Sequence, residues 1–71
     1  TNINFFTYKD VNVKIHVYDV TGRMIHEVVN NSFDKGSHLS TWNATDFDKG
    51  IYLIKLLVND AVISSERVVI Q

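Results

Sequence analysis

The chain has 71 residues, with 7 basic and 8 acidic side chains, a formal net charge of −1, and neither cysteine nor proline. This length allows one domain, and the balanced charge offers no field that would attract nucleic acid or an anionic membrane. The absence of cysteine excludes disulfides and thiolate metal sites, and no apolar stretch approaches the ~20 residues that span a bilayer. The sequence therefore favours neither nucleic-acid binding nor membrane insertion.

Alternating apolar and polar residues, which are typical of half-buried strands, predict the elements of the first half. The clearest case is segment 11–18, where every second residue is a valine or isoleucine. A turn is expected at 19–22, because aspartate opens it and glycine closes it. Strands are also predicted at 2–8 and 23–29. Residues 30–36 are rich in Asn, Asp and Gly and are expected to form a loop.

The second half continues with strands. Segment 37–43 alternates, with Trp42 on the same side as two other residues of the strand. Segment 51–58 is apolar on both faces except at Lys55, as expected of a central strand that is covered on both sides. A last strand is predicted at 62–70. About six strands with regular turns and no helix predict an all-β fold, an antiparallel sandwich or barrel.

The tetrapeptide Phe-Asp-Lys-Gly occurs at 33–36 and again at 47–50. It is open to three interpretations: an internal repeat, an acidic metal loop, or two turns that start strands. In a calcium loop Asp46 and Asp48 would be ligands one and three, but position five falls on Gly50 and position twelve on a leucine. Too few oxygen ligands remain, so we interpret both copies as turns.

No constellation of residues predicts catalysis. The three histidines fall on three different predicted strands without a ligand spacing, and no serine lies in a nucleophile elbow. The carboxylates are scattered over turns, so no acid–base pair can be proposed. Most aromatic rings are needed for the core of so small a domain, with Phe6 and Tyr18 the two expected to face outward. The sequence predicts no enzyme, no cofactor, no metal site and no small-molecule substrate.

The second copy of the tetrapeptide leads into Tyr52 and, two residues on, Ile54. Immunoglobulin-type sandwiches carry a tyrosine corner two residues before a core cysteine, and here isoleucine stands in that place. The ring is expected to pack inward while its hydroxyl bonds the backbone of the preceding turn. Gly50 would allow a positive φ there, Phe47 would pack beneath the turn, and Trp42 would fill the centre.

The segments "VKIHVYDVTGRMI", "KGSHLSTWNATDFDKGIYLIKL" and "ERVVI" together resemble the type A C-terminal sorting domain of the bacterial type IX secretion system. The resemblance covers essentially the whole chain and implies one domain, residues 1–71, with a small immunoglobulin-like antiparallel β-sandwich of six to seven strands. The matching motif residues are Tyr18, Asp19, Gly22, Gly36, Trp42, Phe47, Asp48, Gly50 and Tyr52.

The family implies a non-catalytic address for a cargo protein fused at its N-terminal side. An outer-membrane translocon recognises the domain and a sortase-like cysteine peptidase usually removes it. The cargo passes through the periplasm and outer membrane and is secreted or joined to lipopolysaccharide at the cell surface. The resemblance places much of the recognition in the last strand: Arg67, Val68, Val69, Ile70 and Gln71.

The sequence departs from the family pattern at both ends. The stretch rich in proline and asparagine that normally precedes the first strand is absent, which suggests a domain shortened at its N-terminal edge. Gln71 stands where the family usually has lysine. A structural or adhesive immunoglobulin-like module of a cell-surface protein, similar to the flagellar hook-capping protein, stays open as an alternative, as does carbohydrate binding through exposed aromatic rings.

Overall fold

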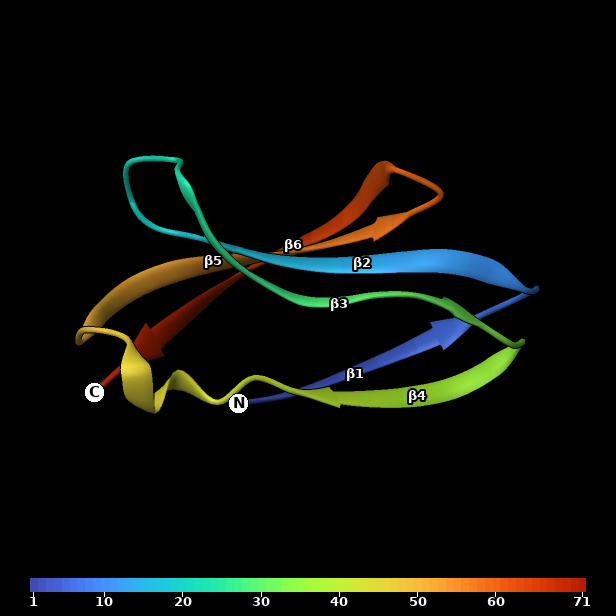
Figure 1. The fold of residues 1–71 in the computed structure, drawn as a ribbon, viewed down its shortest axis with the longest axis horizontal. Coiled ribbons are helices and arrows are strands. Elements are labelled where there is room, and N and C mark those ends of the chain that lie inside the picture. Colours follow the sequence, from blue (N-terminus) through green and yellow to red (C-terminus); the bar gives the residue numbers. More distant parts are fainter.

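The structure is a computed structural model that describes residues 1–71. Two antiparallel sheets lie one over the other and are joined by short turns (Figure 1). One sheet has the strand order β1-β4 and the other the order β3-β2-β5-β6. The elements are β1 Asn2–Thr7, β2 Val11–Tyr18, β3 Met24–Phe33, β4 Gly36–Thr41, the 3₁₀ turn η1 Ala44–Asp46, β5 Gly50–Val58 and β6 Ala61–Ile70. The predicted all-β sandwich is confirmed, with six strands.

The core lies between the two sheets and is built around β2. Buried and half-buried residues alternate along this strand, and Val13, Ile15 and Val17 have no exposed surface. A fully buried side chain of this kind stabilises a fold by about 1.5–3 kcal/mol. The buried apolar residues are Phe5, Val11, Val13, Ile15, Val17, Trp42, Tyr52 and Ile54. The period-two pattern of segment 11–18 thus identified the central wall of the core.

The predicted loop at 30–36 is wrong for its first four residues. Strand β3 continues to Phe33 because β2 pairs with it along its whole length, from Val11 opposite Phe33 onward. Those backbone groups need partners, and pairing with β2 overrides the turn tendency of the asparagines. The ring of Phe33 also packs edge-on against Phe5, with 5.1 Å between centroids. Only Asp34 and Lys35 separate β3 from β4.

Strand β5 occupies the predicted central position, between β2 and β6, but the expectation that both its faces are covered is wrong. Tyr52 and Ile54 on the inner face are buried, whereas Ile51 on the outer face is 44% exposed. The reason is that the β1–β4 sheet covers only one side of the four-stranded sheet (Figure 1). Strand β5 therefore leaves an apolar face without cover.

No strand pairing joins the two sheets, so the sandwich has free strand edges along both sides. Strands β1, β3, β4 and β6 each pair with a single neighbour and have a free edge, and a two-residue turn joins β3 to β4. Both chain ends lie at the same end of the molecule (Figure 1). No helix in the structure has the length and apolarity required to cross a membrane.

Candidate recognition site

The last strand, β6, is the most exposed element of the structure. Eight of its ten residues are exposed and none is buried, and it pairs only with β5. A strand at the edge of a sheet presents unpaired N–H and C=O groups along its free side. Such a strand can accept a further strand by main-chain hydrogen bonding.

The five residues that the resemblance assigned to recognition all lie at the end of β6 or directly after it, but they divide between two faces. Val68 and Ile70 are half-buried and pack against the core. Arg67 and Val69 are exposed and lie opposite Leu53 and Ile51 on the outer face. Gln71 follows the strand and is exposed. A partner can therefore reach the side chains of positions 67, 69 and 71 without disturbing the core.

A tyrosine corner anchors the start of β5. The hydroxyl of Tyr52 donates a hydrogen bond of 2.6 Å to the carbonyl oxygen of Asp48, as expected from the sequence. The ring is 8% exposed and meets Trp42 edge-on at a centroid distance of 5.9 Å. Phe47 packs on Trp42 at 5.2 Å, and Gly50 has φ 153°. The corner fixes the start of the strand to which β6 pairs.

Trp42 fills the end of the core beside this corner. It is 1% exposed, and its indole Nε1 has no hydrogen-bond partner. Its backbone forms a mutual pair with Thr1, since Trp42 N donates to Thr1 O at 2.8 Å and Thr1 N donates to Trp42 O at 2.9 Å. An unpaired buried donor is unfavourable, so the stabilising contribution of Trp42 comes from its packed area.

The turn from β2 to β3 is held by Asp19. Its Oδ1 accepts hydrogen bonds from Thr21 Oγ1 at 2.6 Å, Thr21 N at 3.0 Å and Arg23 N at 3.1 Å. The hydrogen bond from the Thr21 hydroxyl, helped by those from the backbone, lowers the pKa of Asp19 below its ordinary value. Gly22 has φ 88° and donates to Asp19 O at 3.1 Å. The predicted turn at 19–22 is confirmed.

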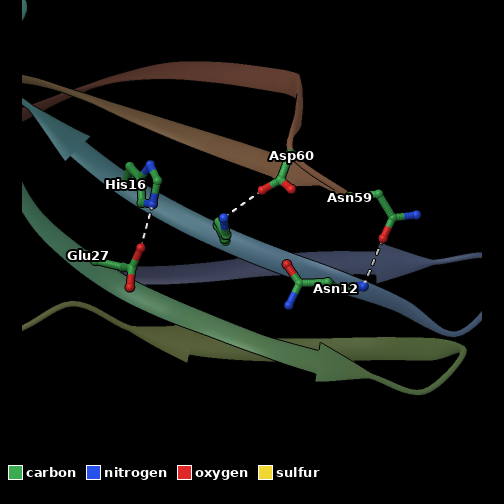
Figure 2. A network of polar contacts seen from close by, with 6 residues as sticks. Asn12, His16, Glu27, Asn59 and Asp60 are labelled. Carbon is green, nitrogen blue, oxygen red and sulfur yellow. Dashed lines mark hydrogen bonds and ion pairs between the residues drawn. The ribbon is translucent and has the colours of Figure 1, made fainter.

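A polar network covers part of the outer face of the four-stranded sheet (Figure 2). His16 Nε2 lies 2.7 Å from Glu27 Oε2 across β2 and β3, and Lys14 Nζ pairs with Asp60 Oδ1 at 2.5 Å. The hydrogen bond with His16 lowers the pKa of Glu27, and that with Asp60 raises the pKa of Lys14. Asn12 N donates to Asn59 Oδ1 at 3.2 Å.

Sequence reasoning missed this network because cross-strand pairs depend on register. The available signal was the row of polar residues on the outward positions of segment 11–18. The hairpin turn between β5 and β6 supplies two of the partners: Asn59 and Asp60 have φ 49° and 68°, as a two-residue type I′ turn requires. No group of three or more His, Asp or Glu side chains is arranged to hold a metal ion.

The two stacked sheets, the tyrosine corner and the highly exposed edge strand β6 define a small immunoglobulin-like β-sandwich module. The sequence places this module in a family. All residues, 1–71, match the family described as the secretion system C-terminal sorting domain, and the chain belongs to that family. Neither a curated protein nor a solved structure gives a significant match.

The chain is thus a C-terminal secretion signal of the type IX system. It works with the secretion machinery and with a cargo on its N-terminal side, and that cargo is exported to the cell surface or secreted across the outer membrane. The role of the family is that of an address and not of an enzyme. This assignment favours sorting over the structural or adhesive alternative.

Proposed function

We propose that the outer-membrane translocon holds this domain through the end of β6, and that a sortase-like peptidase then separates the domain from its cargo. The observation that carries the proposal is the exposure of β6, eight of whose ten residues are exposed on a strand with one free edge. Main-chain groups on that edge supply affinity in β-augmentation, while alternate side chains supply specificity.

The two faces of β6 suit this role differently. Val68 and Ile70 keep the strand attached to the core, so the free edge is presented in a fixed orientation. Arg67, Val69 and Gln71 remain accessible to the partner. Preorganisation of this kind lowers the entropy lost on binding.

The test joins a signal peptide, a reporter and the 71-residue chain in a host that has the type IX system. The intact fusion is expected outside the cell with the domain removed, and a fusion lacking Val68–Gln71 is expected to stay in the periplasm. Because this deletion removes the pairing of Ile70, Val69 and Val68 with β5, a second fusion replaces the same four residues by threonine, which preserves strand propensity. Export of both altered fusions at the level of the intact one would overturn the proposal.

The peptidase step is tested in a host lacking the sortase-like enzyme. There the reporter is expected at the cell envelope with the domain still attached, as judged by its mass. Normal trimming in that host would contradict this part of the proposal.

A further inference from the structure

The outer face of β5 and β6 carries apolar side chains that no other part of the chain covers. Ile51 is 44% and Val69 54% exposed, and the two lie opposite each other in the antiparallel register. Leu53, half-buried, lies opposite Arg67 on the same face. Adjacent exposed apolar residues on the face of a sheet offer a partner apolar area to bury.

Two cations flank these apolar residues without a carboxylate partner. Lys55 lies over the ring of Tyr18, 4.5 Å from its centroid, two positions along β5 from Leu53. None of the three ion pairs of the structure includes Lys55 or the Arg67 guanidinium. Both positive charges are therefore free to meet an anionic group.

The acids near this face are already engaged. Glu27 pairs with a histidine of β2, and Asp60 in the β5–β6 turn pairs with a lysine of β2. Glu66, the acid of β6, lies opposite the buried Ile54 and thus belongs to the inner-facing row. A chain of net charge −1 thus presents an excess of positive charge on this one face.

We propose that this face docks a protein surface of the secretion machinery that combines apolar side chains with carboxylates. The docking face is defined by Ile51, Leu53, Lys55, Arg67 and Val69. The inference rests on the proposed function, because it takes the recognition surface at the end of β6 and adds to it the neighbouring residues of β5. Complementary charge sets partner choice and association rate, and the Arg67 guanidinium can hold a carboxylate through two hydrogen bonds.

Charge argues against a second copy of this chain as the occupant. If two copies of this chain met through this face, Lys55 and Arg67 of one copy would lie near Lys55 and Arg67 of the other. Like charges across an interface are unfavourable. Covering Ile51 and Val69 calls for apolar side chains in the partner, and balancing the cations calls for carboxylates beside them. A protein surface carrying both fits the docking face.

The test uses the reporter fusion of the full chain. The double variant Lys55→Glu/Arg67→Glu is expected to lower export about tenfold or more, because attraction becomes repulsion. The double variant Lys55→Gln/Arg67→Gln, which only removes the charges, is expected to show a smaller loss. The matched control is Lys35→Glu/Lys49→Glu, which makes the same change in net charge at exposed turn positions and is expected to export like the unaltered chain.

Thermal unfolding of each purified variant shows that the sandwich is intact. Unaltered export of Lys55→Glu/Arg67→Glu, or an equal loss in the Lys35→Glu/Lys49→Glu control, overturns the proposal. The fusion lacking Val68–Gln71 separates the two proposals. If it stays in the periplasm while the Lys55→Glu/Arg67→Glu fusion is exported, the docking face is wrong and the role of β6 stands. If both are exported, both proposals fail.

A photo-reactive phenylalanine in place of Ile51 identifies the occupant. A protein adduct that disappears in the Lys55→Glu/Arg67→Glu background supports the proposal. An adduct of twice the mass of the fusion, which indicates a second copy, overturns it. So does an adduct with lipid, or a protein adduct that persists in the charge-reversed background.

Discussion

Strands β2 and β6 belong to the same sheet and are both rich in valine and isoleucine, yet they have opposite roles. Four of the eight residues of β2 are buried, whereas none of the ten residues of β6 is buried. Strand β2 lies between two partners, with the β1–β4 sheet over its inner face, and β6 lies at the edge with one partner. Similar composition thus builds the core in one position and an accessible surface in the other.

The largest expected effect comes from emptying the end of the core. Trp42→Ala removes the largest fully buried side chain and is expected to lower the free energy of unfolding by about 3–5 kcal/mol. A domain of this length has roughly 4–11 kcal/mol in total, so urea unfolding is expected to show the loss of a large part of the stability. The control is Leu39→Ala, at a position that is 61% exposed. A loss below about 1 kcal/mol for Trp42→Ala would show that the core is organised differently.

The comparison of β2 with β6 can be tested with one substitution made twice. Val17→Ala in β2 is expected to reduce the free energy of unfolding by about 2 kcal/mol, because it removes fully buried methyl groups. Val69→Ala in β6, where the side chain is 54% exposed, is expected to change it by less than about 0.5 kcal/mol. Equal losses measured by chemical denaturation would mean that β6 contributes to the core as much as β2 does.

A smaller effect is expected at the tyrosine corner. Tyr52→Phe keeps the buried ring and removes the hydroxyl that bonds Asp48, so a loss of about 0.5–1.5 kcal/mol is expected. Tyr8→Phe, at a residue that is 83% exposed, is the matched control and is expected to be neutral. If the two variants unfold at the same denaturant concentration, the hydroxyl bond contributes nothing to stability.

The smallest effect concerns pH. Hydrogen bonds in the folded state lower the pKa of Asp19 and of Glu27 below their ordinary values of 3.8 and 4.5. The stability they contribute is present above those values and is lost as the pH falls through the lower folded-state pKa values. The urea concentration at the unfolding midpoint is therefore expected to decrease as the pH is lowered below about 4.5. In the variant Asp19→Asn/Glu27→Gln this decrease is expected to be less steep. Identical pH profiles for the variant and the unaltered chain would show that these two carboxylates do not contribute to the pH dependence of stability.

Much of the fold could be predicted because it depends on local pattern. The alternation in segment 11–18 identified the core strand, and the spacing from Gly50 to Tyr52 predicted the corner hydrogen bond that the structure contains. The turn at 19–22 followed from an aspartate and a glycine in fixed positions. These features need no knowledge of which strands become neighbours.

The wrong predictions concern features that depend on which strands become neighbours. The composition of residues 30–33 is typical of a loop, but these residues pair with β2 and therefore belong to strand β3. Segment 51–58 looks covered on both faces, but the second sheet has only two strands and covers one. At the candidate site, the division of positions 67–71 between an inner and an outer face needed the register of β5 and β6. Register depends on pairing between residues far apart in the chain, and the alternation within a single strand does not show which partner residue lies opposite.

We propose that the core around β2 determines the stability of the fold, whereas the end of β6 determines recognition by the secretion machinery. The most direct test measures export and the free energy of unfolding together for Val69→Asp and Val17→Ala. The account predicts that Val69→Asp strongly reduces export at nearly unchanged stability, whereas Val17→Ala reduces stability but remains folded and is exported. Export that follows stability in both variants would contradict the separation of address from core.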